Sequence, residues 1–140
     1  MQTRGGWTGW LLGVALLVGA GAQAAPLLRC ELTYAGRTST VEARPVTDPY
    51  RVPAQPVGEF GRFHFQPVLV GEGERIDRIA LYVYMSAAPQ PLLIQQAKYL
   101  PPFASAGHSG PLPLTGEQRL YAGPMERELI YQCHLHGVQP

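Results

Sequence analysis

The stretch LRCELTY, residues 28–34, alternates apolar and polar side chains. Successive side chains of a β-strand point to opposite faces, so this segment has one apolar face, which carries Cys30. The stretch ELIYQCHLH, residues 128–136, shows the same alternation near the other end of the chain and puts Cys133 on its apolar face. The two segments predict two strands of one β domain, with both thiols directed inward.

The chain has two cysteines, Cys30 and Cys133. An even pair in an exported protein normally forms a disulfide, because the compartment is oxidising. We expect a Cys30–Cys133 bridge with Cα atoms about 4.4 to 6.8 Å apart. Closing so long a loop stabilises the folded chain by about 4 to 5 kcal/mol in the chain-entropy account.

The first 24 residues have the layout of a secretory signal peptide. Arg4 supplies one positive charge, an apolar run covers residues 10–20, and the small residues Ala22 and Ala24 occupy the positions that a signal peptidase reads. The run is shorter than the roughly 20 apolar residues of a membrane-spanning helix. We expect residues 1–24 to be removed, residues 25–140 to form a single domain, and no stable membrane insertion after cleavage.

The rest of the chain consists of short alternating segments separated by turns rich in Gly and Pro. Strands are predicted at residues 38–43, 63–70, 79–86, 92–99 and 119–121, with a hairpin across Ala35-Gly36-Arg37 and with Pro67 at a bulge or an edge. The segment 79–86 is the most apolar, so we expect it to be central. Roughly seven such strands predict an all-β fold, a small antiparallel β-sandwich of immunoglobulin-like dimensions, with a small β-barrel as the alternative.

Charge and motifs exclude several function classes. Arg4 is the only charged residue of the predicted signal peptide, so residues 25–140 carry equal numbers of basic and acidic side chains. Nucleic-acid-binding domains usually carry a basic patch, and this sequence has none. Glycine-rich phosphate loops, nucleophile elbows and calcium loops are also missing from the sequence. We therefore expect no nucleic-acid partner, no cofactor and no catalytic site; a secreted hydrolase is the least favoured reading.

A metal site is the second reading of the sequence. His134 and His136 are two residues apart on a predicted strand, which puts both imidazoles on one face about 6.6 Å apart. Neutral imidazoles at such a spacing suit copper or zinc. A third ligand would have to come from His64 or His108, which lie elsewhere in the sequence. The alternative is that these histidines are ordinary surface residues.

The tyrosines of the segment 79–86 indicate a recognition surface. Tyr82 and Tyr84 lie on the second face of that strand. If the face is open, the two rings form a platform of the kind enriched at interfaces; if it is covered, they belong to the core. Tyr99, Phe103 and Leu112 are candidates for extending the surface.

Residues 100–118 form the longest segment without periodicity, and they carry Phe103, Leu112 and Leu114. Loops of this length in compact domains are usually functional or mobile, so we expect this loop to meet a partner. The opposing possibility is that its apolar side chains pack under the sheet.

The sequence thus favours an exported binding or accessory module that acts through surface recognition and not through catalysis. We expect a periplasmic rather than an extracellular location, and a partner that is another protein or an envelope component. A periplasmic metal-binding protein using His134 and His136 is the alternative.

Overall fold

A computed structural model describes residues 24–59, 61–103, 110–121 and 127–138 of the chain. The predicted signal peptide lies outside the described residues, apart from Ala24. The elements in chain order are β1 (Leu27–Tyr34), β2 (Arg37–Ala43), the 3-10 turn η1 (Pro49–Arg51), β3 (Gln55–Val57), β4 (Phe63–Glu72), β5 (Arg75–Met85), β6 (Leu92–Tyr99), β7 (Leu112–Pro113), β8 (Gln118–Tyr121) and β9 (Glu128–His136).

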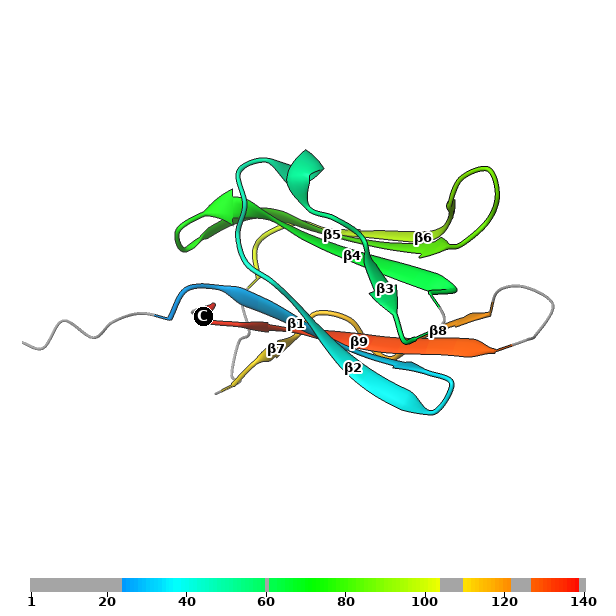
Figure 1. Ribbon diagram of the computed structural model, residues 1–140. Helices are drawn as coiled ribbons and strands as arrows, with labels where there is room; N and C mark the ends of the chain where they lie inside the picture. Colours follow the sequence, from blue (N-terminus) through cyan, green and yellow to red (C-terminus); the bar gives the residue numbers. More distant parts are fainter. Residues whose placement is uncertain (1–23, 60, 104–109, 122–126, 139–140) are drawn as a thin grey trace, which may run out of the picture.

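The strands form two antiparallel sheets that lie one above the other (Figure 1). Sheet A has the order β2-β1-β9-β7, with β8 also paired to β9, and sheet B has the order β3-β4-β5-β6. The all-β prediction is confirmed, and β5 is an inner strand of sheet B, as its apolar character predicts. The two sheets are not closed into a barrel, so the barrel alternative is wrong.

The core lies between the sheets and follows the predicted alternation. Every second residue of β9 is buried, and the same holds for Leu28 to Tyr34 on β1. The largest side chains that are fully buried in the core are Tyr131, Phe63, Phe65, Leu28, Leu32, Leu69, Ile79, Leu81, Leu129 and Leu135. A chain of this length is expected to build a single continuous core.

The predicted disulfide is present within sheet A. Cys30 and Cys133 are direct cross-strand partners on β1 and β9, with an S–S distance of 2.07 Å. Their Cα atoms are 4.0 Å apart, which is below the range we expected. The backbone N–H and C=O of Cys133 both bond away from β1, to residues 114 and 115. The cysteines are therefore a pair without mutual backbone hydrogen bonds, the class in which antiparallel strands approach most closely.

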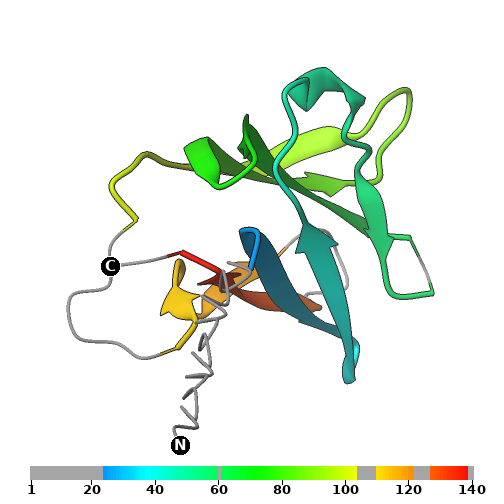
Figure 2. The ribbon, with the colours of Figure 1, turned by 90° about the vertical axis from the view of Figure 1, so that its left-hand side faces the viewer.

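Residues 44–54 connect the sheets and cross to the outer side of sheet B. Figure 2 shows the chain rising from β2 along one side of the two layers, and in Figure 1 the η1 turn lies above sheet B. Val46 pairs with β4 by accepting from Gly71 N and donating to Leu69 O. Asp48 caps η1 by accepting from Tyr50 N at 3.1 Å, and Pro49 supplies the fixed φ of the first position.

Two short strands are not predicted from the sequence. Each contains a proline: β3 has Pro56 and β7 has Pro113. Strands of two or three residues are too short to show a period of two. Pro67 is buried within the continuous strand β4, at a local edge of sheet B as expected. It lies between the β3 and Val46 pairings, where β5 is the one described strand that pairs with β4, so its missing amide interrupts no second ladder.

Candidate functional site

The outer face of sheet B, which points away from the core, carries the two predicted tyrosines. Strand register sets which side chains share this face, because directly opposite residues of an antiparallel pair point the same way. The rows across β4, β5 and β6 are His64, Tyr84 and Leu93; Gln66, Tyr82 and Gln96; and Val68, Ala80 and Lys98. Aromatic and amide side chains therefore gather at the middle and at one end of the face.

Tyr82 and Tyr84 form a stacked pair on this face. Their ring centroids are 6.4 Å apart and the ring planes differ by 23°. Both residues are half-buried, so this part of the face is only partly covered by the rest of the chain. Leu93, the direct partner of Tyr84 on β6, is 44% exposed and adds an apolar edge to the pair.

A hydrogen-bonded amide holds this arrangement. The Tyr84 hydroxyl donates to Gln66 Oε1 at 3.0 Å, and Gln66 Nε2 donates to the Val52 carbonyl oxygen at 2.6 Å. Residues 44–54, which cross to the outer side of sheet B, are called the crossing segment below. Gln66 thereby connects the crossing segment to the tyrosine pair through the oxygen and the nitrogen of its amide. A side chain bonded at both ends is ordered before any ligand arrives, which lowers the entropy cost of binding.

The crossing segment covers only part of the face. Val68 and Ala80 are each 3% exposed although they point away from sheet A, and Pro49 and Tyr50 line a hollow with them. This hollow has a volume of about 320 Å³ and also reaches Tyr82 and Tyr84. The Tyr50 ring is 95% exposed, so the segment presents a third aromatic side chain to solvent.

A second hollow of about 460 Å³ lies next to the first at Tyr84. The two share Gln66 and Tyr84, and the second is otherwise lined by Ala54, His64, Gln90 and Pro91. None of the described residues that line it is acidic, Lys or Arg. An apolar concavity with a few convergent polar groups is the usual form of a binding site.

Two cations stand at the far end of the face from Tyr84. Arg78 lines the first hollow, and Lys98 lies directly opposite Ala80 on β6. Within the described part of the chain, neither makes an ion pair, whereas Arg29, Arg37, Arg51, Arg75 and Arg119 all pair with carboxylates. The face therefore runs from a neutral aromatic end to a positively charged end.

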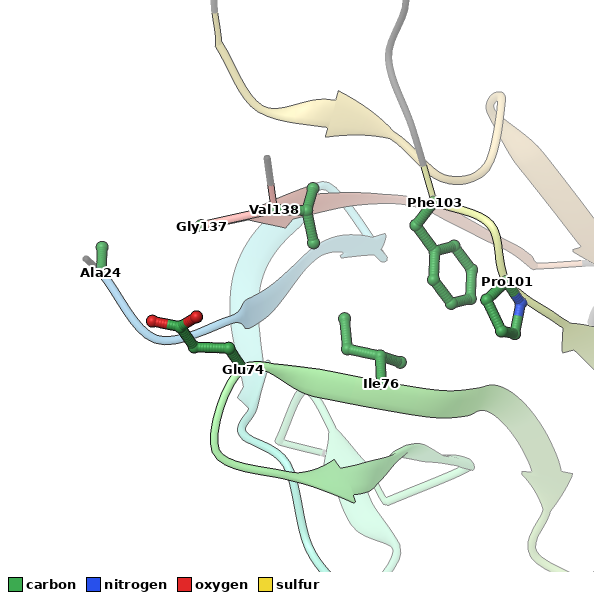
Figure 3. A pocket seen from close by; sticks show the side chains of 7 residues that line it. All are labelled: Ala24, Glu74, Ile76, Pro101, Phe103, Gly137 and Val138. Carbon is green, nitrogen blue, oxygen red and sulfur yellow. The ribbon is translucent and has the colours of Figure 1, made fainter. Parts of the chain in front are cut away.

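The open end of the molecule has a third hollow, between the two sheets (Figure 3). It measures about 270 Å³, and the side chains of Ile76, Pro101, Phe103 and Val138 line it. These side chains belong to the margin of the core. Ala24 forms part of its wall, and Ala24 would leave with the predicted signal peptide, so we assign no binding role to this hollow.

The structure does not bring the five predicted surface residues together. Tyr82 and Tyr84 share the outer face of sheet B, but Tyr99 pairs with the buried Ile79 and packs against the core. Phe103 and Leu112 also pack against the core as partly buried side chains, and Leu112 belongs to β7. Phe103 thus lies at the margin of the core and residues 112–113 form a strand of sheet A, while residues 104–109 lie outside the described ranges.

The candidate metal ligands are separated. His134 and His136 share the outer face of sheet A, whereas His64 lies on the outer face of sheet B. His108 lies outside the described residues. Among the residues that are described, no three His, Cys, Asp or Glu side chains are close enough to hold a metal ion.

One serine and one histidine lie near each other at the end of β5. Ser86 Oγ is 3.4 Å from His64 Nδ1, but its own proton goes to the Gly61 carbonyl oxygen. A nucleophilic serine needs a base that removes its proton and a third group that orients that base. In the described ranges no acid bonds to His64, so this pair lacks the arrangement of a hydrolase.

No protein-family model matches the chain, and comparison with curated proteins and with solved structures gives no significant match. Across the described ranges, no helix is both long enough and apolar enough to cross a membrane. The function must be argued from the chain's own geometry.

Sequence reasoning identified the tyrosines and missed their surroundings. No pattern in the sequence marks Gln66 or Arg78 as a neighbour of the tyrosine pair. Register was the missing signal, because only the pairing of β4, β5 and β6 shows which side chains stand beside Tyr82 and Tyr84.

Proposed function

We propose that this protein is an exported binding module and that the outer face of sheet B is its recognition surface. One observation carries the proposal: Tyr82 and Tyr84 form a half-buried stacked pair beside two hollows, and Gln66 holds Tyr84 through a hydrogen bond. Tyrosine supplies a large, rigid contact area with a polar end, and it is enriched at interfaces for that reason.

The contrast with the other sheet supports this choice of face. On the outer face of sheet A, Arg29 pairs with Glu42 and Arg119 pairs with Glu128, and Gln132 donates to Glu31. These polar groups satisfy one another. Sheet B instead presents aromatic rings, an apolar edge at Leu93 and the cations Arg78 and Lys98, which form no ion pair with any described residue, and this leaves interactions for a partner to make.

Export belongs to the same proposal. The Cys30–Cys133 disulfide fits an oxidising compartment, and the signal-like residues 1–24 point the same way. We propose a periplasmic location and a partner that is a protein or another component of the cell envelope.

The proposal is tested by photocrosslinking in intact cells. One variant carries a photoreactive amino acid in place of Gln96, which stands beside Tyr82, and the matched control carries it in place of Gln132 on the outer face of sheet A. We expect a defined adduct from position 96 and a much weaker one from position 132. No adduct from position 96, or equal adducts from both, would contradict the proposal.

A further inference from the structure

We infer that the ligand of this face is an extended, proline-rich peptide segment of a partner, bound along β5 and β6 with a carboxylate at Arg78 and Lys98. The inference rests on the proposed function and adds the chemical class of the ligand. The geometry that points to it is a short extended stretch of the protein's own chain, residues 52–54, which contains a proline and is bonded to Gln66 of the same face.

The last residues of the crossing segment are an internal example of such a ligand. The 3-10 turn η1 (Pro49–Arg51) lies beside Val68 and Ala80, and the extended stretch is the Val52-Pro53-Ala54 that follows it. Val52 has φ −81° and ψ 115°, in the extended region near polyproline II. Val52 precedes Pro53, and the residue before a proline is held in this region by sterics.

Gln66 shows how the face binds the backbone of such a chain. Its amide donates to the carbonyl oxygen of Val52 at 2.6 Å. Polyproline II segments have no internal hydrogen bonds, so their carbonyl oxygens are free to accept from a binding surface. Aromatic-lined grooves recognise proline-rich segments because the rings pack on prolines and the ligand loses little entropy on binding.

The crossing segment leaves the β5–β6 side of the face open. Gln96 lies opposite Tyr82 there, on the same outer face, and Leu93 lies opposite Tyr84. The second hollow, with Tyr84 and Pro91 in its lining, is also unfilled by the segment. An incoming peptide thus meets an amide at Gln96, as residues 52–54 meet one at Gln66, together with the aromatic and apolar side chains of Tyr84 and Leu93.

The length of the face and its two cations indicate the length and the charge of the ligand. Tyr84 and Arg78 are six residues apart on one strand, a span of about 20 Å at 3.3 Å per residue. A polyproline II chain that rises about 3.1 Å per residue covers this span with six or seven residues. Arg78 and Lys98 make no ion pair in the described ranges, so a carboxylate at that end of the peptide gives them a partner.

The test measures binding of three labelled peptides to the mature, disulfide-bonded protein by fluorescence anisotropy. The probe has ten prolines followed by two aspartates. One control replaces the prolines with alternating glycine and serine and keeps the aspartates, and the other keeps the prolines and ends in two asparagines. We expect micromolar binding of the probe, about tenfold weaker binding of the glycine–serine peptide, and about threefold weaker binding of the asparagine peptide.

Variants locate the bound peptide. Tyr84→Ala is expected to abolish binding of the probe, and Arg78→Gln is expected to remove the preference for aspartate over asparagine while proline is still required. Arg127→Gln, an exposed arginine outside this face, serves as the charge control and should leave all three affinities unchanged. High salt should reduce the aspartate preference, because exposed charges are screened.

The alternative ligand to be tested is an acidic oligosaccharide, tri-galacturonate. Aromatic side chains can stack on its sugar rings, and Arg78 and Lys98 can pair with its carboxylates. Binding of tri-galacturonate without binding of the probe would overturn the inference, as would equal binding of the proline and glycine–serine peptides. If no peptide binds while the adduct from position 96 persists, the ligand class is wrong and the proposed function stands. If that adduct is also missing, the proposed function fails.

Discussion

The hydroxyl oxygen of Thr115 accepts a hydrogen bond from the backbone N–H of Cys133 at 2.9 Å. Thr115 is 6% exposed and is the only buried polar side chain among the described residues. It lies between β7 and β8, two short strands that both pair with β9. Its hydroxyl oxygen accepts from Cys133 in place of a backbone carbonyl of the neighbouring strand, and so extends the pairing of sheet A beside the disulfide.

Thr115→Val should therefore destabilise the protein. The substitution keeps the shape and leaves the Cys133 amide buried without an acceptor, which costs about 1 to 3 kcal/mol. Urea unfolding of the oxidised protein measures the change, and Thr115→Ser, which keeps the hydroxyl, is the control. Equal stability of Thr115→Val and the wild type would show that water or another group satisfies the amide.

The segment after β6 should behave as part of the core margin. Phe103 and Leu112 pack against the core, whereas Leu100 on the same segment is 62% exposed. Phe103→Ser and Leu112→Ser are expected to cost roughly 1 to 3 kcal/mol each, because partly buried side chains lose less than fully buried ones. Leu100→Ser is the matched control, with a change within about 0.5 kcal/mol. Unchanged melting temperatures for Phe103→Ser and Leu112→Ser would restore this segment as a recognition loop.

Alkaline pH should destabilise the protein through Tyr131. Burial raises the pKa of Tyr131 to about 12, and the nearby Tyr99 adds to the increase. Between pH 10 and pH 12 the unfolded chain loses this proton while the folded chain keeps it, so stability falls as pH rises. The loss is about 2 to 3 kcal/mol, at 1.36 kcal/mol for each unit of pKa difference. Urea unfolding at several pH values measures it; Tyr131→Phe should flatten the slope, and an unchanged slope in that variant would refute the assignment.

The disulfide joins residues separated by 103 positions and should contribute strongly to stability. Removing both cysteines with Cys30→Ala and Cys133→Ala is expected to cost about 2 to 5 kcal/mol, mainly because the unfolded chain regains freedom. Urea unfolding of the oxidised wild type and of the double variant gives the difference. Mass spectrometry after alkylation is the companion measurement, and two alkylatable thiols in the unreduced exported protein would contradict the bridge.

The sequence predicts the long strands well because each has one buried face. Alternation places Cys30, Cys133 and Tyr131 inside, and the hairpin between β1 and β2 turns at Ala35 and Gly36, where both residues have positive φ. The short strands β3 and β7 and the role of Thr115 are not predictable in this way. They depend on the position of the neighbouring strand and not on any local period.

The candidate site was only half predictable for a related reason. Alternation identifies Tyr82 and Tyr84 as neighbours on one face of β5, but it does not show what covers that face. Cover depends on residues 44–54, where prolines interrupt any alternation of apolar and polar side chains, and on Gln66, which reaches across to Val52. Tyr99 was assigned to the same surface although its register with Ile79 turns it inward.

The central claim is that the tyrosine pair on sheet B is the surface that meets a partner. The most direct test measures the yield of the crosslinked adduct from position 96 in two backgrounds, Tyr84→Ala and Tyr121→Ala. Tyr121 is a 67% exposed tyrosine on the outer face of sheet A, so its variant removes an equal ring from the other side of the molecule. With folding verified by thermal melting, we expect Tyr84→Ala to lower the adduct yield about tenfold, equivalent to about 1.4 kcal/mol, and Tyr121→Ala to leave it unchanged. Equal yields in the two variants would contradict the account.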